Sequence, residues 1–131
     1  MDKRLKRIIH RYALWIAHDR ICIYCGSIIP TVFDLEEDHI IPQKYKEKPK
    51  ELEKIIEKYG LRKDFDIDAY YNRVPTNSGC NRKKSSNMHS KEAIHIYINK
   101  AEKKASEIKK IQEETEKKIS ATDDLFKKGM D

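Results

Sequence analysis

Apolar residues recur at helical spacing in three stretches of the chain, and each stretch has recognisable start or stop signals. The first stretch predicts an amphipathic helix over residues 3–19. The second predicts a short helix that starts near Pro49 and stops at Gly60. The third begins after Ser90, a favoured N-cap residue, and has no proline or glycine before Gly129. Its 4-3-4-3 apolar spacing predicts one long helix.

Short apolar and β-branched runs between these helices predict strands. Residues 28–30 and 32–35 are two such pieces. A further strand leads to Pro42, which cannot donate a ladder hydrogen bond and therefore ends it. Helices and short strands together predict an α+β fold.

Capping residues mark two further helix starts. Ser78 or Thr76 is a candidate cap for a helix that carries Asn81. The segment Thr122-Asp123-Asp124-Leu125 is a candidate cap for a final short helix.

The aspartates Asp64, Asp66 and Asp68 alternate with Phe65 and Ile67, but the glycine and distal glutamate of a calcium loop are absent. We therefore interpret the three aspartates as turn and solvent-facing residues.

The net charge of the chain indicates a negatively charged binding partner. Lysine and arginine number 28 against 22 acidic residues, a formal net charge of +6. Such an excess is compatible with a polyanion, and the first helix carries much of it on one face. No run of 18 apolar residues occurs, and Met1–Leu5 lacks the apolar stretch of a signal peptide. We therefore expect no membrane partner and a cytoplasmic setting. The 3 cysteines, an odd count that includes a Cys-x-x-Cys pair, favour a reducing compartment.

Two segments carry the candidate chemistry: residues 37–42 and residues 72–84. Asp38 supplies a hard oxygen suited to Mg²⁺ or Mn²⁺, and His39 follows it with the pKa range of a general base. Asn81 adds a neutral oxygen. Cations that suit phosphates come directly after it, at Arg82, Lys83 and Lys84. This inventory is typical of phosphodiester hydrolysis with one metal ion.

The order of the motifs resembles that of the HNH endonucleases. Asp-His-Ile-Ile-Pro at 38–42 is followed by Asn-Arg-Val-Pro at 72–75 and by Cys-Asn-Arg-Lys-Lys at 80–84. The resemblance covers roughly residues 22–87 and implies a ββα-metal finger, a short antiparallel hairpin plus a helix. We expect a single nuclease domain over 1–131. Its parts are a basic N-terminal helix (1–20), the core (21–89) with a helical insertion (43–71), and a helical C-terminal extension (90–131).

The resemblance also implies a role for each matching residue. His39 corresponds to the general base, Asp38 to the carboxylate that binds Mg²⁺ or Mn²⁺, and Asn81 to the residue that completes the metal site. Asn72 corresponds to the middle asparagine, which orients the base and the substrate. The implied products are a 5′-phosphate and a 3′-hydroxyl. The expected nucleic-acid-binding residues are Arg73, Arg82, Lys83 and Lys84.

The cysteines depart from the family pattern. Many members hold a structural zinc with two Cys-x-x-Cys pairs, and here Cys22 and Cys25 form the first pair. In the second, Asn77 stands three residues before Cys80, where a cysteine is expected. Three thiolates are one short of a closed tetrahedral Zn²⁺ site. The fourth ligand could be His18, His89 or water. The alternative is that no zinc binds and that packing holds the finger together.

The expected function is metal-dependent hydrolysis of DNA, with double-stranded DNA as the substrate. A role in restriction or antiviral defence, in a bacterial or phage setting, rests on analogy. The alternatives are an RNase or single-strand nuclease, and a non-catalytic nucleic-acid-binding subunit of a larger complex. The long C-terminal helix leaves open a homodimer or a partner protein docked on it.

Overall fold

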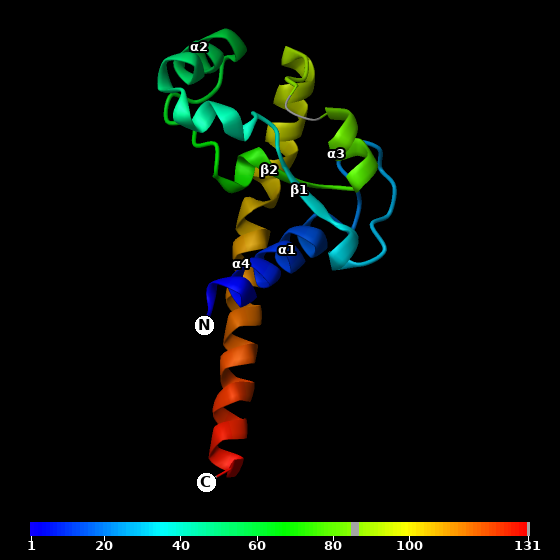
Figure 1. The fold of residues 1–131 in the computed structure, drawn as a ribbon, viewed down its shortest axis with the longest axis vertical. Helices are drawn as coiled ribbons and strands as arrows, with labels where there is room; N and C mark the ends of the chain where they lie inside the picture. The colour runs from blue at the N-terminus through cyan, green and yellow to red at the C-terminus, as the bar shows by residue number, and fades with distance from the viewer. Residues whose placement is uncertain (85–86, 131) are drawn as a thin grey trace.

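The computed structural model describes residues 1–84 and 87–130, and it confirms an α+β fold. Figure 1 shows a small hairpin and the shorter helices arranged around one long helix, which extends well beyond the rest of the molecule at its C-terminal end. In chain order the elements are α1 (Lys3–Ala17), η1 (Val32–Asp34), β1 (Glu36–His39), η2 (Gln43–Glu47), α2 (Pro49–Tyr59), η3 (Tyr70–Asn72), β2 (Arg73–Thr76), α3 (Ser78–Lys84) and α4 (Lys91–Met130).

Helix α1 is the predicted amphipathic helix, and it ends two residues before the predicted boundary. Asp2 caps its start by accepting a hydrogen bond from the Leu5 N–H at 2.8 Å. Its end lies at Ala17 because Asp19 and Arg20 both adopt positive φ angles, of 60° and 61°, which do not continue a right-handed helix.

The predicted helix in the insertion is confirmed as α2. Pro49 occupies its first turn, where the missing N–H costs no hydrogen bond. Gly60 ends the helix in the left-handed region at φ 64°, and its N–H donates to the Glu57 carbonyl.

The core of the fold is a hairpin followed by a short helix, as the resemblance implied. Strands β1 and β2 are antiparallel, and Asp38 lies opposite Val74 while His39 lies opposite Arg73. Helix α3 follows two residues after β2. This ββα unit places residues 38, 39 and 81 on neighbouring elements although the insertion separates them in sequence.

Three local predictions around this core are wrong. Residues 28–30 do not form a strand, and Ile28 makes an isolated β-bridge to Ile21. Residues 32–34 form a 3₁₀ turn instead of a strand, because the Asp34 carboxylate accepts hydrogen bonds from the Thr31 N–H and hydroxyl. Helix α3 is capped by Asn77, whose Oδ1 accepts from the Cys80 N–H at 2.8 Å. Thr76 instead donates its hydroxyl to the Glu36 carbonyl across the hairpin.

Helix α4 begins after Ser90, whose Oγ accepts from the Ala93 N–H, as predicted. It runs without interruption for 40 residues, so the separate helix starting at residues 122–125 is wrong. The Thr122 hydroxyl donates to the Lys118 carbonyl within the helix and does not cap a new one.

Two apolar clusters join these elements to α4. Ile108 packs with Leu14 of α1, with Cys22 and with Leu35. Ile94 and Ala101 belong to a second cluster. Its other buried members are Ile40 and Ile41 just after β1, Phe65 and Ile67 near the end of the insertion, and Val74 of β2. Helix α4 therefore connects both clusters, and its C-terminal half extends past α1 (Figure 1). Within the described chain, no helix combines the length and apolar character needed to cross a bilayer.

Candidate active site

A pocket of about 560 Å³ opens between the end of β1 and the second half of α3. It is lined by Glu37, Asp38, His39, Pro42, Gln43, Lys44, Asn81, Arg82 and Lys84. Because neighbouring side chains of a strand point to opposite faces, β1 contacts two different sets of partners. Glu36 and Asp38 contact α3, whereas Glu37 and His39 face α1 and the end of the insertion.

Asp38 is nearly buried, at 8% exposure, and its Oδ2 atom has two partners. The Tyr24 hydroxyl donates to it at 2.5 Å, and the Lys84 ammonium lies 3.0 Å away. Burial and the neighbouring Asp38 carboxylate raise the pKa of Tyr24, so this phenol keeps its proton and remains a donor. Both contacts engage Oδ2, which leaves Oδ1 as the oxygen of Asp38 available to a ligand in the pocket.

Asn81 lies in the middle of α3, and its side-chain amide donates to the Glu36 carboxylate at 2.7 Å. This bond orients the amide so that Oδ1 is its acceptor atom on the other side. Asp38 and Asn81 thus offer one carboxylate and one amide oxygen to the same pocket. Two such oxygens, completed by water and phosphate, fit Mg²⁺ or Mn²⁺.

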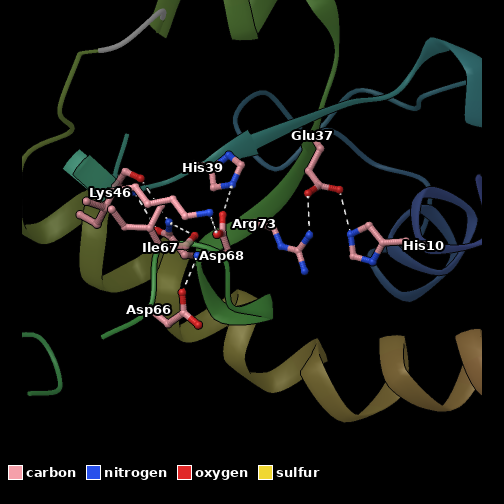
Figure 2. A network of polar contacts seen from close by, with 10 residues as sticks. His10, Glu37, His39, Lys46, Asp66, Ile67, Asp68 and Arg73 are labelled. Atoms are coloured by element: carbon pink, nitrogen blue, oxygen red, sulfur yellow. Dashed lines mark hydrogen bonds and ion pairs between the residues drawn. The ribbon is translucent and has the colours of Figure 1, made fainter. Parts of the chain in front are cut away.

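His39 lies on the opposite face of β1 and is also part of the pocket wall. Its Nε2 atom lies 3.6 Å from Oδ1 of Asp68, as Figure 2 shows. Burial lowers the pKa of His39, and it outweighs the opposite effect of the carboxylates of Glu37 and Asp68. The imidazole is therefore neutral at physiological pH, which a general base requires.

Beside His39, Glu37 binds two cationic or polar partners (Figure 2). His10 Nε2 lies 2.8 Å from one carboxylate oxygen, and Arg73 lies 3.2 Å from the other. Burial alone would raise the pKa of Glu37, but the contacts with His10 and Arg73 dominate and lower it. Glu37 therefore remains ionised. It forms an ion pair with Arg73, which was predicted from the sequence to bind nucleic acid.

Asn72 is completely buried and does not reach the pocket. Its Oδ1 accepts from the Ile41 N–H at 2.8 Å, and its Nδ2 donates to the carbonyls of Ile41 and Ile67 at 3.1 and 2.7 Å. The amide thus connects the end of the His39 strand to the loop before Asp68. Any effect of Asn72 on catalysis acts through this backbone connection.

The three predicted phosphate-binding residues of α3 differ in position. Arg82 and Lys83 are exposed, and Arg82 lines the pocket. Lys84 is 9% exposed and donates to the His39 carbonyl at 2.5 Å as well as contacting Asp38. Lys84 therefore belongs to the inner wall of the site, behind Asp38.

The three cysteines form a separate cluster, with their sulfur atoms within 4.8 Å of one another. Hydrogen bonds from Ser27 lower the pKa of Cys25 to about 6, so its thiolate predominates at neutral pH. The Asn77 side-chain amide donates to this sulfur at 3.2 Å. In the described chain the cluster includes neither His18 nor His89. A soft, three-thiolate donor set of this kind fits Zn²⁺ with one position open to another ligand.

A family model matches residues 28–128, which is most of the chain and contains both site segments. The family is described as a nuclease family of the HNH/ENDO VII superfamily with conserved AHH. The chain belongs to this AHH nuclease family. The resemblance to HNH endonucleases is thereby confirmed, and the protein is a nuclease. Searches of curated proteins and of solved structures found no match.

The sequence of this AHH nuclease contains no Ala-His-His tripeptide, and the residue before His39 is Asp38. Of the histidines within the matched range, His39 is the one that lines the pocket. Three residues that contact the site were not identified from sequence: Tyr24, Glu36 and Asp68. Alternation along β1 was the available signal for Glu36, because it shares a face with Asp38. Asp68 was interpreted as a solvent-facing turn residue, but it lies next to His39 and pairs with Lys46.

Proposed function

We propose that this AHH nuclease is a metal-dependent endonuclease that hydrolyses DNA phosphodiester bonds. The observation that carries the proposal is the pocket between β1 and α3, where Asp38, His39 and Asn81 meet. It combines hard-oxygen ligands, a neutral imidazole and an exposed arginine in one cavity. These are the groups that hydrolysis of a charged diester requires.

Asp38 and Asn81 are the residues that would hold Mg²⁺ or Mn²⁺. When bound there, the ion would neutralise charge that develops on the phosphate during hydrolysis. Lys84 and Tyr24 fix the Asp38 carboxylate through Oδ2, and Glu36 fixes the Asn81 amide. The oxygen donors are therefore oriented by the protein before a ligand arrives.

His39 is the proposed general base and takes a proton from the attacking water. Its neutral state makes this step available at physiological pH, and a general base contributes on the order of 10²–10⁴-fold to the rate. Arg82 and Lys83 are the proposed phosphate contacts, since both are exposed and Arg82 lines the pocket. The proposed products carry a 5′-phosphate and a 3′-hydroxyl.

The proposed zinc site at Cys22, Cys25 and Cys80 has a structural role. It joins the loop that carries Tyr24 to helix α3, and both contribute to the active site. Duplex DNA is the proposed substrate, and restriction or antiviral defence is the proposed setting. RNA and single-stranded DNA are tested as alternative substrates in the same experiment.

The test is cleavage of supercoiled plasmid, single-stranded DNA and RNA with Mg²⁺, with Mn²⁺ and with EDTA. We expect metal-dependent nicking or linearisation of the plasmid, and loss of this activity in His39→Ala by at least about 100-fold. His95→Ala is the matched control because His95 is exposed on α4, outside the pocket. Full activity in His39→Ala would remove His39 as the base, and preferential cleavage of RNA would select the alternative substrate.

A further inference from the structure

Asp68 comes from the end of the insertion and lies beside the ββα core. Residues 43–71 separate the two motif segments, and Asp68 lies near the end of this insertion, two residues before η3 begins at Tyr70. There its Oδ1 faces Nε2 of His39 at 3.6 Å (Figure 2). This separation is longer than a hydrogen bond but within ion-pair range, and catalytic contacts of this kind commonly shorten once substrate binds.

Asp68 is held in place from three sides. Its backbone N–H donates to the Asp66 carboxylate at 2.9 Å. Its second oxygen pairs with the Lys46 ammonium from η2. The carbonyl of the preceding residue, Ile67, accepts from the buried Asn72 amide at 2.7 Å. Since Asn72 also binds both backbone groups of Ile41, one side chain sets the spacing between the His39 strand and the Asp68 loop.

We propose that Asp68 is a positioning residue, which holds the His39 imidazole with its Nε2–H toward the insertion and leaves Nδ1 as the basic nitrogen. The inference rests on the proposed role of His39 as the base. A neutral imidazole has one N–H and one lone pair, and a carboxylate at one nitrogen determines which nitrogen keeps the proton. The insertion thereby supplies part of the active site, in addition to packing against the core.

The electrostatics of Asp68 are consistent with this role. The Lys46 ammonium lowers the pKa of Asp68, so the carboxylate is ionised whenever His39 is neutral. Its side chain is 39% exposed, and Asp68 belongs to neither of the two apolar clusters of the described residues. Replacing it by asparagine therefore removes the charge while keeping the size.

The first test observes the imidazole directly and needs neither metal nor substrate. We would record long-range ¹H–¹⁵N spectra of the histidine rings at pH 8, where imidazoles are neutral. The chain has 5 histidines, and the His39 signals are assigned by their loss in His39→Ala. We expect the Nε2–H tautomer in the wild type and a mixture of tautomers in Asp68→Asn. An Nδ1–H tautomer in the wild type, or no change in the variant, would overturn the proposal.

The second test is cleavage kinetics with Mg²⁺. For Asp68→Asn we expect kcat to fall by roughly 10–100-fold with KM unchanged, by analogy with the carboxylate partners of metal-ligating histidines. Asp64→Asn is the matched control, because Asp64 lies in the same loop and, within the described part of the chain, its ion-pair partner is the exposed Arg62. In the His39→Ala background, Asp68→Asn should cause no further loss. Equal losses in both aspartate variants would overturn the proposal.

The two tests separate this proposal from the function on which it rests. If the wild type cleaves none of the substrates, the proposed function fails, and the tautomer of His39 still decides the role of Asp68. If cleavage requires His39 but is unchanged in Asp68→Asn, the function holds and the positioning role is wrong.

Discussion

Asn72 joins the strand end that carries His39 to the loop that carries Asp68, through three hydrogen bonds to backbone atoms. Its replacement by alanine would leave one N–H and two carbonyls without these partners in a buried place. We expect Asn72→Ala to lose roughly 3 kcal/mol of unfolding free energy, since each buried polar group left unpaired costs on the order of 1 kcal/mol or more. Urea denaturation followed by circular dichroism measures this loss.

The matched control for this prediction is Asn99→Ala, because Asn99 is exposed on α4. We expect this variant to stay within about 0.5 kcal/mol of the wild type. A loss below 1 kcal/mol in Asn72→Ala would show that water or a small backbone shift replaces the three bonds. The connection between the two parts of the site would then depend on packing alone.

Among the helices and strands, the sequence predicted correctly those whose ends are determined by residues close together in the chain. Helix α2 was predicted with both ends because Pro49 and Gly60 act locally. Residues 32–35 were predicted as strand from β-branched and apolar character, but the Asp34 side chain stabilises a 3₁₀ turn there. The proximity of Asp68 to His39 was not predictable, because 28 intervening residues must fold before the two side chains meet.

The cysteine cluster connects the loop at Cys22 and Cys25 to helix α3 at Cys80, and it leads to a prediction about zinc. We expect Zn²⁺ to raise the melting temperature, by an amount equivalent to roughly 2.7 kcal/mol at a hundredfold excess over Kd. A chelator should reverse the effect, and Cys25→Ser should abolish it. Differential scanning fluorimetry measures each case. An unchanged melting temperature with Zn²⁺ would show that packing alone holds this part of the fold.

Asn77→Cys sharpens this prediction because two effects of the substitution have opposite signs. Without metal, the variant loses the α3 cap that Asn77 provides, at a cost of about 1 kcal/mol. With Zn²⁺, it gains a fourth thiolate and should bind the ion more tightly than the wild type does. Asn87→Cys adds an exposed cysteine elsewhere and should leave zinc affinity unchanged.

At the scale of the whole molecule, α4 holds together parts that are distant in sequence. One apolar cluster on it includes α1, and the other includes the hairpin end and the insertion. Residues from the loop after α1, from β1, from the end of the insertion and from α3 then converge on one pocket region. The motifs predicted the contributions of β1 and α3, whereas the contributions of Tyr24 and Asp68 depend on this packing.

The junction of α1 and α4 contains a buried histidine that makes stability depend on pH. His18 is 9% exposed, with Lys104 of α4 and Asp19 as its charged neighbours. Burial, assisted by Lys104, lowers the pKa of His18 from 6.5 to about 4. Between these values the unfolded chain binds a proton that the folded chain does not, so stability falls as pH decreases from 6.5 toward 4.

This linkage predicts a loss of roughly 2 kcal/mol from His18 between pH 7 and pH 5, since each pKa unit corresponds to about 1.4 kcal/mol. His18→Met removes the titrating ring at similar volume, and its unfolding free energy should vary less with pH by that amount. His95→Met changes an exposed histidine on α4 and should keep the wild-type dependence. Urea titrations at pH 5, 6 and 7 give the change of unfolding free energy with pH for the wild type and for each of the two variants. A wild-type slope in His18→Met would mean that the ring is protonated in the folded protein, and that the junction opens to admit water at acidic pH.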